Sequence, residues 1–137
     1  LFFLIVIFFT TFNANAYNIK VKVKGLKDST CYLGYYFGQK SYTPVDTAVA
    51  DASGNMVFSG KTDLKHGVYL IIIPKSYFEL IITKEQYFKI ETDTANVIEN
   101  MKVIGNTECQ LFYDFQKKMI ELSKKAKNEK LLSDTII

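Results

Sequence analysis

The sequence predicts a mainly β fold: an antiparallel β-sandwich or partly open barrel of about seven to eight strands, followed by a C-terminal amphipathic α-helix. Short apolar segments that alternate with period two are separated by turn-forming residues. Aromatic residues make up 15% of the 137-residue chain, and its nine Tyr and eleven Phe favour strands. After Gly105 the apolar spacing changes to three and four, which indicates a helix.

Length and charge limit the number of domains and the class of partner. A chain of 137 residues folds as one domain and is long enough to bury a core. Its formal net charge is +3, and its basic residues are spread along the sequence. Nucleic-acid-binding proteins gather such residues on one face, so we expect no nucleic-acid partner.

The first 16 residues have the features of a secretory signal peptide. Residues 1–9 are apolar throughout, and Ala14-Asn15-Ala16 supplies the A-x-A pattern of a cleavage site. The apolar run is shorter than the ~20 residues of a membrane-spanning helix. No Met and no basic stretch precede Leu1, so we expect the sequence to begin inside its signal. Cleavage after Ala16 would leave an exported, periplasmic protein that starts at Tyr17.

The first strand of the mature chain has the clearest pattern. In residues 18–25, Ile19, Val21 and Val23 alternate with three lysines, which predicts one buried and one solvated face. Lysine rows are common on exposed sheet edges, where they prevent edge-to-edge pairing. Further strands are predicted at residues 30–37, 42–50, 56–60, 67–73, 77–83, 86–92 and 101–105, of which 67–73 is apolar enough to be buried on both faces.

Residues 42–60 are predicted to form a strand, a tight turn and a returning strand, a hairpin at the centre of the domain. Residues 51–55 contain four turn formers, and Gly54 is suited to a positive φ. The alternating oxygens of Asp51, Ser53 and Asn55 resemble the start of a calcium loop. An EF-hand needs a glutamate at its twelfth position, which is Thr62 here, so we expect a turn without a metal.

A helix is predicted from Asn106 or Thr107, either of which can cap it, to about residue 130. An apolar stripe follows helical spacing through Leu111, Phe112, Phe115, Met119 and Leu122. The predicted organisation is therefore a signal peptide over residues 1–16, a β domain over 17–105, and a helix over 106–137 that leads toward a downstream domain.

The sequence contains no recognisable catalytic, cofactor-binding or metal-binding constellation. His66 is the single histidine, in a Lys-His-Gly turn, and no CxxC, HExxH or Gly-rich phosphate loop is present. We therefore expect a non-enzymatic chain without a cofactor. Cys31 and Cys109 are the only cysteines; export permits a disulfide between them, and two separate buried thiols are the preferred alternative.

Tyrosines offer the remaining candidate for a functional surface. Tyr32, Tyr35 and Tyr36 lie on one predicted strand, close in sequence to Tyr42. Aromatic platforms of this kind bind sugars or partner proteins, and they also form buried cross-strand pairs. Both faces of one strand cannot be exposed, so we expect about half of these tyrosines to lie in the core.

The chain resembles a known family in three places: Asp46-Thr47, the pattern Asp51-x-x-Gly54-x-x-x-Phe58-x-Gly60, and Val103-x-Gly105-Asn106. Over residues 17–118 it is similar to the N-terminal β domain, of unknown function, of exported thioredoxin-like and AhpC/TSA-type thiol–disulfide oxidoreductases of gram-negative bacteria. In that family the redox chemistry belongs to a downstream domain that carries a CxxC. The resemblance therefore implies a scaffold domain and assigns no redox role to any residue here.

Two functional hypotheses follow from the sequence. The first is a non-catalytic exported domain that positions or dimerises a downstream thioredoxin-like domain, with a homodimer possible, or docks an envelope protein. The second is a free-standing periplasmic binding module for a carbohydrate or an envelope protein, which would use the tyrosines between Tyr32 and Tyr42.

Overall fold

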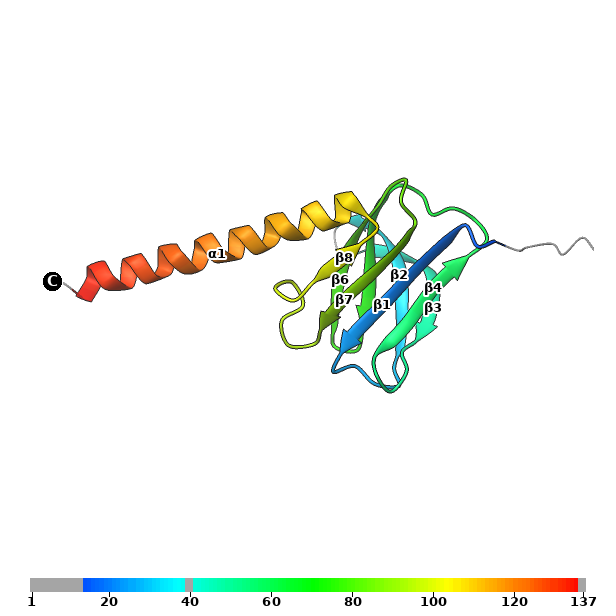
Figure 1. Ribbon diagram of the computed structural model, residues 1–137, viewed down its shortest axis with the longest axis horizontal. Coiled ribbons are helices and arrows are strands. Elements are labelled where there is room, and N and C mark those ends of the chain that lie inside the picture. Colours follow the sequence, from blue (N-terminus) through cyan, green and yellow to red (C-terminus); the bar gives the residue numbers. More distant parts are fainter. Residues whose placement is uncertain (1–13, 39–40, 136–137) are drawn as a thin grey trace, which may run out of the picture.

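The computed structural model describes residues 14–38 and 41–135. Eight strands form two sheets that face each other, and one long helix leaves the sandwich at its side (Figure 1). The predicted fold class is confirmed, and both sheets are open, so the architecture is a sandwich and not a closed barrel. The apolar part of the predicted signal peptide lies outside the described residues.

The first sheet has the strand order β4-β1-β7-β8. Its strands are β1 (Tyr17–Lys24), β4 (Asn55–Gly60), β7 (Tyr87–Asp93) and β8 (Lys102–Ile104). β1 pairs antiparallel with β4 and parallel with β7, whereas β7 and β8 are antiparallel. The sequence predicts antiparallel pairing, and the parallel pair of β1 with β7 differs from that prediction. These two strands are far apart in sequence, because the chain passes through the other sheet between them.

The second sheet has the strand order β3-β2-β5-β6 and is antiparallel throughout. Its strands are β2 (Thr30–Gly38), β3 (Ser41–Val49), β5 (Gly67–Ile73) and β6 (Ser76–Ile82). β5 lies between two neighbours, in agreement with its apolar sequence, and Leu70 and Ile71 are buried on its opposite faces. A β-bulge interrupts the β2–β3 pairing between Leu33 and Gly34.

The predicted hairpin over residues 42–60 is wrong. β3 pairs with β2 and β4 pairs with β1, so this segment crosses from one sheet to the other. The carboxylate of Asp46 links the two layers, since it accepts hydrogen bonds from the Ser59 backbone N–H at 3.0 Å and the Tyr17 hydroxyl at 2.9 Å. The alternation of residues was recognised correctly, but alternation alone does not specify which strand pairs with which.

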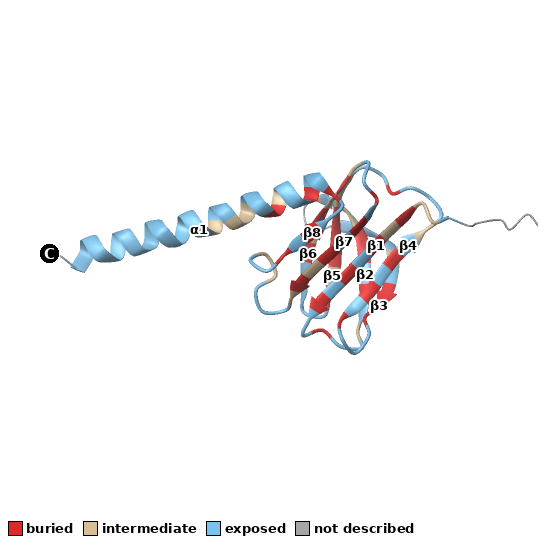
Figure 2. Ribbon diagram, in the orientation of Figure 1, coloured by how far each residue is buried: buried red, intermediate tan, exposed pale blue. Residues whose placement is uncertain are grey.

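The core lies between the two sheets, where buried residues alternate with more exposed ones along most strands (Figure 2). Ile19, Val21 and Val23 of β1 are buried, while the lysines between them face solvent. β1 is an inner strand of its sheet, so the lysine row does not protect an edge. Two of these lysines lie beside acidic residues of β7 instead, with Lys22 opposite Glu91 and Lys24 opposite Asp93, whereas Lys20 is opposite Lys89.

Helix α1 (Thr107–Thr135) is anchored to the sandwich mainly by its first turns, and further along Lys124 forms an ion pair with Glu99. Asn106 is the N-cap: its side-chain oxygen accepts the Cys109 N–H at 3.0 Å, and its amide donates to the Ile81 carbonyl at 2.8 Å. Tyr113 is buried and donates its hydroxyl to the Glu79 carbonyl at 2.6 Å. The rest of the helix projects away and is exposed (Figures 1 and 2).

Most of the predicted apolar stripe of α1 does not face the sandwich, although its Phe112 is partly buried and packs against the core. Leu111 and Phe115 are 61% and 66% exposed, and Met119 and Leu122 are both 47% exposed. The helix uses Cys109 and Tyr113 to contact the sheets, which leaves this stripe on the opposite side. No helix within residues 14–38 and 41–135 is long and apolar enough to span a membrane.

Candidate functional site

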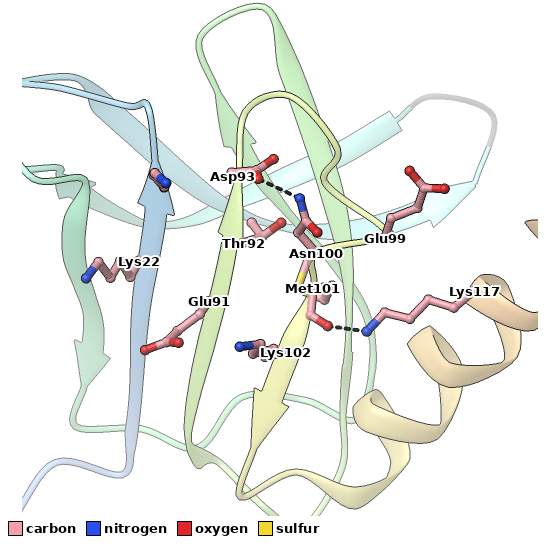
Figure 3. Close-up of a pocket in the computed structure, with 10 residues that line it drawn as sticks. Lys22, Glu91, Thr92, Asp93, Glu99, Asn100, Met101, Lys102 and Lys117 are labelled. Carbon is pink, nitrogen blue, oxygen red and sulfur yellow. Dashed lines mark hydrogen bonds between the residues drawn. The ribbon is translucent and has the colours of Figure 1, made fainter.

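A charged hollow of about 490 Å³ lies where β1, β7, β8 and the start of α1 meet (Figure 3). Glu91 stands between Lys22 and Lys102 in the strand register, and it forms an ion pair with Lys89. This ion pair lowers the pKa of Glu91. The lysines and carboxylates therefore neutralise one another across the strands.

The loop beside this hollow is held by Asp93. Its carboxylate accepts the backbone N–H groups of Asn96 at 2.7 Å and Ala95 at 3.0 Å, and the side-chain amide of Asn100 at 2.6 Å. The Asn96 N–H contributes most to the lowered pKa of Asp93. Across the hollow, Lys117 of α1 donates to the Met101 carbonyl (Figure 3). The arrangement fastens the loop and the helix to the sheet, so we assign it a structural role.

The four tyrosines predicted as one contact surface are divided between two places. Tyr35 turns inward, where its ring meets those of Tyr69 at 5.0 Å and Phe37 at 4.9 Å between ring centroids. Tyr32 and Tyr42 are each 43% exposed on the outer face of the second sheet. Tyr36 is half-buried and lies directly opposite Tyr42. About half of these rings were expected to lie in the core, whereas Tyr35 is the one of the four that packs against it, and it is only partly buried.

The outer face of the second sheet carries an aromatic groove of about 410 Å³. We use this name for the hollow lined by Tyr36, Tyr42, Leu70, Ile72, Tyr77 and Glu79. Tyr77 and Glu79 come from β6 and were not predicted, since their strand is separated from the other tyrosines by a long stretch of sequence. Alternation along residues 77–83 places both residues on one face, but only the β5–β6 register places that face beside Tyr36.

The inward aromatics line a second hollow, of about 430 Å³, at one end of the sandwich. Tyr17, Tyr35 and Tyr69 contribute rings, and Lys61 and Lys65 lie at its rim. Burial is the main cause of the raised pKa of Tyr17, and its hydrogen bond to Asp46 raises it further. The hydroxyls of Tyr17 and Tyr69 are already bonded, to Asp46 and to the Lys65 carbonyl, so these rings belong to the core.

The two cysteines are free, buried thiols at distant places in the sandwich. Cys31 lies on β2, whereas Cys109 lies in the first turn of α1 against Ile81 of β6, and β5 stands between these two strands in the sheet. The bridge that the sequence left open does not form in this structure.

Both thiols are expected to resist alkylation in the folded protein. Burial raises the pKa of Cys31 and of Cys109, which reduces the population of the reactive thiolate. We expect iodoacetamide to react at least about a hundredfold more slowly with the native protein than with the denatured, unreduced protein, which should show two free thiols. Fast labelling of the native protein, or no free thiols after denaturation, would contradict this.

The turn that resembled a calcium loop is closed by its own hydrogen bonds. One carboxylate oxygen of Asp51 accepts the backbone N–H groups of Ser53 at 2.8 Å and Asn55 at 2.9 Å, and the Asn55 amide donates to the same carboxylate. Among the residues that the structure describes, no group of three or more His, Cys, Asp or Glu could hold a metal ion. Turn geometry accounts for these residues, and His66 is exposed in its loop.

Acid is expected to weaken this turn. Hydrogen bonds from Asn55 and Ser53 lower the pKa of Asp51, so its contribution to stability is present above the ordinary aspartate pKa of about 4 and is lost as the pH falls through the lower folded value. Thermal melts at neutral and acidic pH should show a smaller loss of Tm on acidification for Asp51→Asn than for the parent. The exposed Asp63→Asn is the control, and an unchanged pH dependence in Asp51→Asn would contradict this role.

Comparison with known families gives one match. The family described as a domain of unknown function (DUF4369) covers residues 17–112, which includes all eight strands and the start of α1 as far as Phe112. The chain belongs to this family. The DUF4369 match begins at Tyr17, the first residue of β1 and the residue expected to follow signal cleavage. No curated protein matches the chain.

Proposed function

We propose that this DUF4369 domain is a non-catalytic, exported interaction domain that positions or dimerises a thioredoxin-like thiol–disulfide oxidoreductase domain. The observation that carries the proposal is the exposed apolar stripe of α1, which we define as Leu111, Phe115, Met119 and Leu122. The sequence resemblance to exported thioredoxin-like proteins supplies the class of partner.

The stripe has the features of a surface that another protein covers. Its four side chains follow one another at helical spacing, and each is at least 47% exposed. On one flank, Glu121 pairs with Lys118 at 3.0 Å and with Lys125 at 2.8 Å. These pairs lower the pKa of Glu121 to about 2. A charged flank beside an apolar stripe is the usual arrangement of a helix that binds another helix or a groove.

Two carboxylates placed in the stripe test its role in the full-length gene product. In the Phe115→Glu/Leu122→Glu variant, burial of charge should disrupt the contact made by the stripe. We expect dissociation of a dimer in light scattering, or faster proteolytic separation of the redox domain if the stripe holds that domain. Lys127→Glu, which lies off the stripe, is the matched control. A double variant that equals the parent in both measurements would refute the proposal.

The gene sequence after the codon for Ile137 tests the class of partner. A CxxC that follows a strand and opens a helix there would support attachment to a thioredoxin-like domain. A stop codon at that point would refute the attachment, and only the stripe's contact with a separate chain would remain.

Export predicts the start of the mature protein. Cleavage after Ala16 would leave β1 whole and would remove the hydrogen bond from the Ala16 N–H to the Gly60 carbonyl, at 2.6 Å. We expect the intact mass of protein from a periplasmic fraction to correspond to a chain that begins at Tyr17. Retention of residues 1–16, or recovery from the cytoplasm alone, would contradict this.

A second candidate function is a free-standing periplasmic binding module for a carbohydrate or an envelope protein. The aromatic groove favours it, because three tyrosines line one hollow on the outer sheet face. Glycan binding measured for the parent and for Tyr36→Ala and Tyr77→Ala tests the carbohydrate alternative, and equal binding by all three folded proteins would count against it.

A further inference from the structure

The aromatic groove owes its shape to a glycine. On the outer face, Gly34 of β2 stands opposite Leu70 of β5, and Leu70 stands opposite Glu79 of β6. A Cβ at Gly34 would lie 2.5 Å from Cδ2 of Tyr42, so the absent side chain allows the Tyr42 ring to lie over the sheet. The Tyr42 ring and Leu70 thereby become wall and floor of the same hollow.

The groove combines aromatic walls with one carboxylate. Tyr36 and Tyr42 stand opposite each other on one side, and Tyr77, 62% exposed, stands opposite Ile72 on the other. Glu79 is the charged residue of the lining, and no ion pair within residues 14–38 and 41–135 neutralises it. A ligand bound in the groove would therefore contact tyrosine rings and a negatively charged carboxylate.

We propose that the aromatic groove binds the guanidinium group of an arginine side chain presented by a protein partner. Guanidinium is planar, stacks on aromatic rings and pairs with a carboxylate through two parallel N–H···O bonds. The rings attract a cation over their faces, and Glu79 supplies the matching charge. The inference rests on the binding-module candidate and is independent of the stripe on α1.

Other ligand classes fit the groove less well. A quaternary ammonium ion has no N–H to donate to Glu79, so the carboxylate would contribute charge alone. A sugar presents many hydroxyls that need hydrogen-bond partners, whereas most of the floor and walls are apolar or aromatic. A neutral peptide would leave Glu79 without a counter-charge. Arginine uses both the rings and the carboxylate.

Short peptides that differ in one side chain test the proposal. Acetyl-Gly-Arg-Gly-amide is titrated into the folded protein and followed by NMR, with the citrulline and lysine peptides beside it. Citrulline has nearly the shape of arginine without its charge. We expect saturable shifts of groove residues with a Kd in the ~1–10 mM range for arginine, weaker binding for lysine, and at least about tenfold weaker binding for citrulline.

Variants of the protein distinguish the groove from other surfaces. Glu79→Gln keeps the side-chain shape and should weaken binding about tenfold, as should Tyr77→Ala. Tyr87→Ala removes a comparably exposed ring, 56% exposed, from the other sheet and should change nothing. Thermal melts check that each variant is folded.

Three outcomes would overturn the proposal. They are the absence of saturable shifts up to about 50 mM arginine peptide, equal affinity for the citrulline peptide, and unchanged affinity in Glu79→Gln. Binding of an oligosaccharide without binding of the arginine peptide would overturn the arginine assignment and leave the binding-module candidate standing.

Discussion

Replacing Gly54 by alanine is expected to destabilise the domain by about 3 kcal/mol or more, the largest effect of any single methyl group added to a turn here. Gly54 has φ +80°, in the region that side chains disfavour, and a Cβ would lie 2.0 Å from the carbonyl oxygen of Val23. The Val23 carbonyl oxygen cannot move away from this contact freely, because hydrogen bonds hold the backbone of Val23 in place. It accepts the Leu26 N–H at 3.1 Å, while the Val23 N–H donates to the Gly54 carbonyl at 2.9 Å.

Gly38→Ala is the matched control for this experiment. Gly38 also has a positive φ, +87°, but an added Cβ would meet no atom of the described residues within 4 Å. It should therefore cost only about 1 kcal/mol, the conformational penalty without the clash. Urea unfolding of the parent and both variants gives the comparison. If Gly54→Ala cost no more than Gly38→Ala, the close approach of the turn to β1 would not be a real constraint.

Truncating Phe58 to alanine is expected to cost about 3–5 kcal/mol. Its ring is fully buried between the sheets, opposite the equally buried Ile19 of β1. Removal of the ring loses the free energy gained by transferring it from water to the core. It also leaves a cavity, and the surrounding strands cannot close this cavity without breaking hydrogen bonds between strands. A domain of this size has a total stability of about 5–15 kcal/mol, so the variant should be close to unfolding at room temperature.

The neighbouring Val57→Ala separates burial from strand propensity. Val57 lies on the same strand, faces the opposite side and is 47% exposed, so its truncation should cost less than about 1 kcal/mol. Urea unfolding measures both values. Similar costs for the two variants would mean that the inner and outer faces of β4 are assigned incorrectly.

Much of the fold could be predicted because local pattern and burial agree along most strands. Alternation in β1 identified its buried face, and the change of apolar period after Gly105 identified the helix, with Asn106 as one of its two candidate caps. Propensity could not show that the helix would turn its most apolar stripe to solvent. Cys109 and Tyr113 are the residues that meet the sheets, because Asn106 fixes the angle at which the helix begins.

Less of the candidate site could be predicted. The tyrosines of β2 and β3 were identified by their clustering in sequence, whereas Tyr77 and Glu79 entered the groove only through the pairing of β5 with β6. The role of Gly34 could not be predicted from the sequence either, since it depends on the Tyr42 ring lying over it. A site assembled from three or more strands is set by register, which a single sequence does not contain.

Spacing and turn-forming residues within each segment were enough to predict the class of this protein, with its strands, their buried faces, its turns and its terminal helix. Three features depend instead on contacts between distant segments: residues 42–60 cross between sheets, β1 lies inside its sheet beside a parallel β7, and the stripe of α1 is exposed. The physical reason is that local patterns fix which face of an element is apolar. The choice of neighbour depends on how all the apolar faces are covered at once.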